Sequence, residues 1–62
     1  MPEPIVTEAS MLDWEPGEWP FRTTIDGVKC TFKRAIRADG ELIAVVYKVT
    51  ERPEQEIHVL ND

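Results

Sequence analysis

Apolar and polar residues alternate from residue 21 onward, which is the pattern of half-buried β-strands. Two alternating runs, 21–25 and 28–37, are separated by Asp26-Gly27, a strong signal for a two-residue hairpin turn. Pairing across this turn places the apolar side chains of the ribbon on one face: Phe21, Ile25, Val28, Cys30 and Phe32. A register shifted by one residue would mix apolar with charged side chains, so the pattern selects its own register.

Two further strands are expected after this hairpin. Residues 41–50 are apolar at nearly every position from 42 to 47, and a strand that is apolar on both sides is usually covered on both sides. We therefore expect this strand at the centre of the domain. Residues 56–60 alternate and predict a short last strand, after a loop over 50–55 in which Pro53 donates no ladder hydrogen bond.

The second turn is expected to be a three-residue loop, Ala38-Asp39-Gly40, with Gly40 in the left-handed region. This register sets Arg37 opposite Glu41, a cross-strand pair of opposite charge. The strands 21–25 and 56–60 are then the two edges of the sheet, where uncovered backbone groups invite pairing with another chain.

The sequence therefore predicts a mainly β fold, a small four-stranded antiparallel meander over residues 21–62. A strongly twisted meander of this length tends to curl into a small, partly open barrel, as SH3-like modules do, and this comparison rests on fold-level analogy alone. Residues 1–20 form an irregular arm with one or two helical turns over 7–14. A type II turn at Pro16-Gly17 is expected to end these helical turns.

The arm contains apolar side chains that could cover the second face of strand 41–50: Ile5, Val6, Met11, Leu12, Trp14 and Trp19. A second copy of the chain is the other candidate cover. Alternatively the arm is a mobile segment that docks on another protein, because Trp is a frequent anchor at interfaces. We favour the folded-back arm, in which the two tryptophans approach each other across the turn.

Charge is unevenly distributed along the 62 residues, whose net charge is −5. Residues 1–20 hold five acids and no base, whereas six of the seven bases lie within 21–48. One face of the first hairpin and its continuation carries a basic row: Arg22, Lys29, Lys33 and Arg37. Such a row on a β-ribbon suits a nucleic-acid backbone. A simpler interpretation is that these side chains only keep an exposed outer face soluble. A third interpretation is that the row binds acidic proteins or the acidic arm of the same chain.

No catalytic arrangement is visible in the sequence. It has no glycine-rich phosphate loop and no nucleophile motif, and so short a chain leaves little volume for a pocket, so neither an enzyme nor a cofactor is expected. A single Cys and a single His provide no Cys/His metal site. Cys30 is predicted to be a buried hydrophobe rather than a reactive thiol, and His58 a solvated side chain.

These features predict a small, non-catalytic interaction module of the accessory or inhibitor type. It would bind an unidentified protein partner through the sheet edge and the arm, with Trp14, Trp19 and Tyr47 as contact residues. The alternatives are a nucleic-acid-binding β-module that uses the basic row and a structural subunit of a homo-oligomer. The sequence has neither the basic start and apolar run of a signal peptide nor a membrane-spanning run, which predicts a cytoplasmic location without membrane contact.

Overall fold

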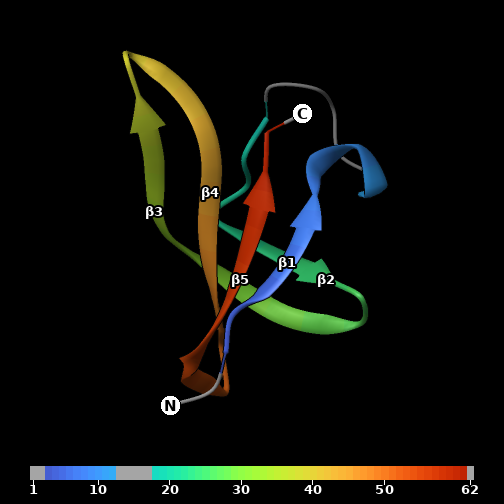
Figure 1. Ribbon diagram of the computed structural model, residues 1–62. Helices are drawn as coiled ribbons and strands as arrows, with labels where there is room; N and C mark the ends of the chain where they lie inside the picture. Colours follow the sequence, from blue (N-terminus) through green and yellow to red (C-terminus); the bar gives the residue numbers. More distant parts are fainter. Residues whose placement is uncertain (1–2, 13–17, 62) are drawn as a thin grey trace.

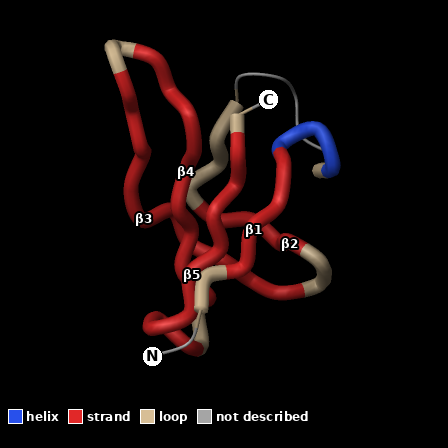
Figure 2. The backbone as a smooth tube through the Cα atoms, viewed as in Figure 1, coloured by secondary structure: helices blue, strands red, loops and turns tan. Residues whose placement is uncertain are grey.

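Five strands form one curled sheet in the computed structural model of the protein, which describes residues 3–12 and 18–61. Their bounds are β1 (Ile5–Glu8), β2 (Arg22–Ile25), β3 (Val28–Ala38), β4 (Glu41–Val49) and β5 (Arg52–Leu60). The strand order is β1-β5-β4-β3-β2 (Figure 1), and the sheet curls into an open half-barrel (Figure 2). The mainly β class and the partly open, barrel-like curl are therefore confirmed.

The arm contributes a fifth strand that the sequence analysis missed. β1 pairs in parallel with β5, and only a short 3-10 helix, η1 (Ala9–Met11), follows it. Of the one or two helical turns predicted over 7–14, this single 3-10 turn is present, whereas Thr7 and Glu8 belong to β1, because the β-branched run from Ile5 to Thr7 favours extended backbone. The prediction that β5 is an edge strand is wrong, because β1 pairs with its outer side. The two edge strands of the sheet are β1 and β2. The predicted turn at Pro16-Gly17 lies outside the described residues.

Both hairpins close with two-residue Asp-Gly turns. The backbone φ angles are 51° and 79° in the first turn and 52° and 80° in the second. Positive φ at both central residues defines the type I′ turn that matches the twist of paired strands. The first hairpin has the predicted register. The second does not: its loop is two residues rather than three, so Ala38 lies opposite Glu41 and Arg37 opposite Leu42.

β5 begins earlier than predicted but contains the expected interruption at Pro53. The β4–β5 register passes from Val49 opposite Arg52 directly to Lys48 opposite Glu56. Residues 53–55 therefore have no partner on β4. This arrangement agrees with the missing N–H of proline, which confines it to bulges and irregular positions within a sheet.

The core cluster lies on the inner face of the curled sheet. Its buried members are Ile25, Cys30, Val45, Tyr47, Val49, Ile57 and Val59. Ala9, Leu12 and Trp19 of the arm pack against them, so the described part of the arm folds back as predicted. It covers the inner face rather than the second face, however, and Ile5, Val6 and Met11 of the predicted cover are exposed. On the opposite side of the sheet, which we call the outer face, β4 also buries Ala44 and Val46. The prediction that this strand is covered on both sides is confirmed.

Tyr47 is part of the core rather than a surface contact for a partner, which corrects the sequence prediction. Its side chain has no exposed area, because it points to the inner face from the central strand. The ring of Phe32 meets it edge-on, with 5.9 Å between ring centroids. The hydroxyl donates a hydrogen bond of 2.7 Å to the carbonyl oxygen of Pro20, and burial raises the Tyr47 pKa to about 12.

We predict that Tyr47→Phe lowers stability by about 1 kcal/mol, because it removes this hydrogen bond and leaves the Pro20 carbonyl without its donor. In a domain of this size that loss lowers the thermal midpoint by about 4–8 °C. Thermal unfolding followed by circular dichroism measures it, with the exposed Phe21→Leu as a control that we expect to change little. An unchanged midpoint for Tyr47→Phe would show that the hydrogen bond is not formed in solution.

Candidate functional site

The outer face of β2, β3 and β4 carries a group of cations that we call the basic face: Arg22, Lys29, Lys33, Arg34 and Lys48. Residues opposite one another on neighbouring strands project to the same side of a sheet. Arg22 lies opposite Thr31, and Thr31 lies opposite Lys48, which joins three strands in one row. Lys29 lies opposite Thr24 in the next row. All of these side chains point away from the core cluster.

A β-bulge at Lys33 decides which cations belong to the basic face. Phe32 lies opposite Tyr47 and Arg34 opposite Val46, so Lys33 is the extra residue of β3. The extra residue shifts the alternation, which brings Arg34 to the outer face and turns Arg37 away from it. Arg37 lies opposite Leu42, whose side chain packs against the core cluster. Arg37 therefore leaves the predicted basic row and Arg34 joins it; no sequence signal marks the bulge.

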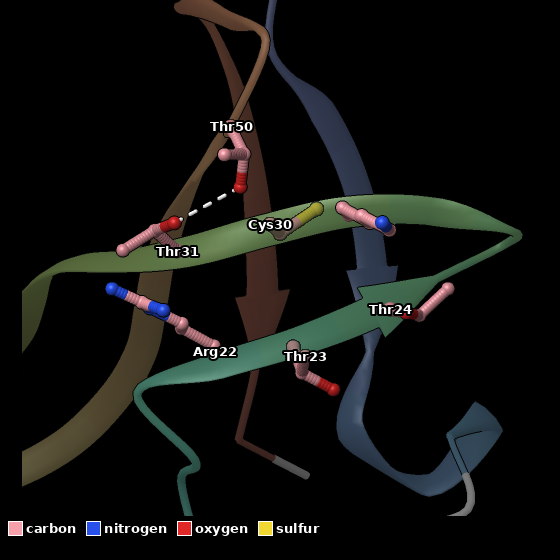
Figure 3. Close-up of a pocket in the computed structure, with 7 residues that line it drawn as sticks. Arg22, Thr23, Thr24, Cys30, Thr31 and Thr50 are labelled. Atoms are coloured by element: carbon pink, nitrogen blue, oxygen red, sulfur yellow. Dashed lines mark hydrogen bonds between the residues drawn. The ribbon is translucent and has the colours of Figure 1, made fainter.

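Beside the first hairpin the protein is hollowed into a groove of about 510 Å³ (Figure 3). Arg22 and Lys29 line it, together with four threonines and Cys30. Thr31 and Thr50 point toward each other in Figure 3, and their hydroxyl oxygens are 3.0 Å apart, within hydrogen-bond distance. The backbone N–H of Thr50 donates to the carbonyl oxygen of Lys29, which fixes the end of β4 against β3.

The cations of the basic face fall into two groups. Lys33 and Arg34 both contact the carboxylate of Glu56 on β5, Arg34 at 3.3 Å. By contrast Arg22, Lys29 and Lys48 make no ion pair with any residue that the structure describes. Arg22 and Lys29 are also exposed, so the groove offers two uncompensated positive charges to solvent.

Glu56 is the anionic centre of the paired group. Hydrogen bonds from Lys33 and His58, with a lesser one from Arg34, lower the Glu56 pKa to about 2, although desolvation acts in the opposite direction. The Nε2 atom of His58 lies 3.1 Å from the second carboxylate oxygen. His58 is therefore partly buried and partnered, not the freely solvated side chain that the sequence predicted. The pairing of β1 beside it, with Val6 opposite His58, explains this partial burial.

Cys30 lines the groove but is not a reactive group. Its side chain is buried, and its thiol donates to the carbonyl oxygen of Val28 at 3.3 Å. Burial raises the Cys30 pKa, which keeps the thiol protonated at neutral pH. The predicted role of a small buried hydrophobe is confirmed.

Of the two tryptophans predicted to contact a partner, Trp14 and Trp19, the structure describes only Trp19. Trp19 is half-buried and packs against the core cluster, so part of its surface is already used inside the fold. Trp14 lies outside the described residues. A role for either indole in partner binding stays a prediction.

No known protein family, no curated protein and no solved structure matches this chain. Within residues 3–12 and 18–61, no three acidic, histidine or cysteine side chains gather as a metal site would require. In the same part of the chain, no helix has the length and apolar character needed to cross a membrane. The basic face and its groove are therefore the features from which a function can be inferred.

We predict that Glu56→Gln lowers the thermal midpoint at pH 7 and that the difference disappears as the pH approaches 2. The folded-state pKa lies below the ordinary value of 4.5, so the carboxylate stabilises the fold above that value and loses this effect as the pH falls toward about 2. Thermal unfolding at several pH values measures it. Glu54→Gln is the matched control, because Glu54 is exposed and its side chain has no hydrogen bond or ion pair within residues 3–12 and 18–61. A difference that persists unchanged at pH 2 would contradict the ion-pair explanation.

Proposed function

We propose that the protein binds nucleic acid through its phosphate backbone, using the basic face. The observation that carries the proposal is the segregation of charge: in a chain of net charge −5, five cations gather on one side of three adjacent strands. A local cluster of this kind attracts a polyanion even when the whole molecule is acidic. Cations on a β-ribbon are one of the established ways in which proteins meet nucleic acid.

The chemistry of the face suits phosphate contacts rather than base recognition. Arg22 offers a planar fork of N–H donors that matches two phosphate oxygens, and Lys29 adds a compact positive charge. In the described part of the chain, neither cation has an ion-pair partner that it must leave before it binds. Contacts to phosphates alone carry little sequence information, so we expect affinity that depends strongly on salt and weakly on base sequence.

Glu56 reduces the availability of Lys33 and Arg34, two of the five cations of the basic face, for binding to phosphate. Its carboxylate already occupies Lys33 and Arg34, as a phosphate would. Binding of a phosphate to either cation therefore competes with an internal anion. The groove cations Arg22 and Lys29 form the first contact region, and the Lys33–Arg34 region contributes only after that ion pair is exchanged.

We predict that Arg22→Gln and Lys29→Gln each weaken oligonucleotide binding about tenfold at roughly 50 mM salt. Each should also reduce the slope of log affinity against log salt concentration by about 1, because one phosphate contact is lost. Fluorescence anisotropy with labelled single- and double-stranded oligonucleotides measures both quantities. Arg37→Gln removes the same charge from an exposed residue outside the basic face and should leave affinity nearly unchanged.

Glu56→Gln should act in the opposite direction and strengthen binding, because it frees Lys33 and Arg34. Glu54→Gln changes the net charge equally without touching a cation of the face, so it separates the local effect from the global one. Absence of binding by wild-type protein to every oligonucleotide at low salt would refute the proposal. Equal weakening by Arg37→Gln would refute the assigned face.

A second candidate function, binding of a protein partner, is favoured by the open edge of β1. Ile5 and Val6 on this edge and Met11 just after it are 47%, 60% and 74% exposed. An extended segment of a partner could add to such an edge as a further strand. Val6→Asp should abolish capture of a specific partner if this edge is used. Self-association through an edge would appear as a dimer in sedimentation experiments.

A further inference from the structure

We propose that the groove beside the first hairpin is the seat of one phosphate group, held by Arg22, Lys29 and the threonine hydroxyls between them. This inference rests on the proposed function and gives it a defined site. The ligand chemistry is a phosphate bearing an attached organic group, supplied either by a nucleic-acid backbone or by a free phosphorylated compound.

The register of the hairpin builds the site from two cross-strand pairs. Arg22 on β2 lies opposite Thr31 on β3, and Thr24 on β2 lies opposite Lys29 on β3. Each strand therefore contributes one cation and one hydroxyl to the same side of the ribbon, with the cations at diagonal corners. Figure 3 shows this side together with Thr50, which approaches from the end of β4. The type I′ turn at residues 26–27 fixes this arrangement.

The hydroxyl groups are able to donate hydrogen bonds to an anion. Thr24 has no side-chain hydrogen bond within the described residues, so its proton is free. Thr31 and Thr50 share a single hydrogen bond, in which either oxygen is the donor. Whichever of the two donates, the other keeps its own proton for a third group. The site therefore offers at least two hydroxyl donors besides the two cations.

The size of the groove agrees with a ligand larger than a bare ion. Its volume of about 510 Å³ falls within the range of roughly 300–1,000 Å³ typical of small-ligand sites. A phosphate between Arg22 and Lys29 leaves room for an attached sugar along the threonine-lined part. The buried thiol of Cys30 on the same lining is uncharged, so it does not repel an anion.

Threonine hydroxyls distinguish this site from a general electrostatic surface. Lysine and arginine on an exposed strand also serve solubility and attract any polyanion, whatever the residues between them are. A phosphate seated in the groove depends in addition on uncharged hydroxyl donors. Removing one hydroxyl without changing charge should therefore affect a seated phosphate and leave diffuse attraction unaltered.

We predict that Thr24→Val weakens oligonucleotide binding about three- to tenfold without changing its salt slope, whereas Thr24→Ser retains wild-type affinity. Thr7→Val on β1, away from the groove, is the matched control for the loss of a hydroxyl. Fluorescence anisotropy at several salt concentrations measures these values. Thr24 is exposed, so these variants should fold, and circular dichroism verifies this directly.

Titrations of wild-type protein with inorganic phosphate and with a nucleoside monophosphate, followed by backbone amide NMR shifts, distinguish the sources of the phosphate. Shifts confined to residues 22–24, 29–31 and 50 support the site for a free phosphate compound. Dependence of oligonucleotide binding on the Thr24 hydroxyl, without such shifts, supports it for the phosphodiester backbone.

The failure of this inference differs from the failure of the proposed function. One outcome would overturn the groove site and retain nucleic-acid binding by the basic face. In that outcome wild type, Thr24→Val and Thr24→Ser bind oligonucleotides equally, and phosphate causes amide NMR shifts outside the groove or none at all. No oligonucleotide binding at all, with phosphate shifts in the groove, overturns nucleic-acid binding and retains the site. Absence of every response overturns both.

Discussion

The central strand, β4, is buried on both of its faces, and most of the structure follows from that constraint. Val45, Tyr47 and Val49 point inward, while Ala44 and Val46 point outward, and none of them is left exposed. A chain of 62 residues is too short to place a second layer over either face of the sheet. The inner face is covered by curling of the sheet and by the returning arm, with Trp19 packed on the core and Pro20 bonded to Tyr47.

The outer face is covered by long polar side chains instead. Val46 lies between Arg34 and His58 in the register, and Glu56 draws these two residues and Lys33 together. Long charged side chains commonly lay their aliphatic stems over apolar surface and keep their charged ends in water. This group of charges therefore has a structural purpose. Arg22 and Lys29 lie away from Val46 and have no ion-pair partner among the residues that the structure describes. No comparable structural role accounts for them there, and this contrast makes the groove the stronger functional candidate.

The sequence predicted those parts of the fold that local chemistry determines. Asp26-Gly27 and the alternation around it were sufficient for the first hairpin, its register and the burial of Cys30. The same dipeptide, Asp39-Gly40, also indicated a two-residue turn, but the prediction placed a three-residue loop there instead. β1 was beyond local reasoning because it pairs with residues about fifty positions away. The bulge at Lys33 leaves no mark in composition, yet it decided which arginine belongs to the basic face.

The distribution of charge across the sheet matters more for ligand binding than the net charge does. The described part of the arm and β1 carry Glu3 and Glu8 at one edge of the sheet, whereas Arg22 and Lys29 lie at the other. For the polyanionic ligand proposed above, this distribution would repel it at the β1 edge and attract it to the β2–β3 hairpin, which would orient it before contact. Long-range steering, which is screened over about 10 Å at moderate salt, and contacts between cations and phosphates would both weaken as salt rises. The hydroxyl contacts proposed for the groove are uncharged, so their contribution to binding should not change the salt slope, and salt titration separates the two contributions.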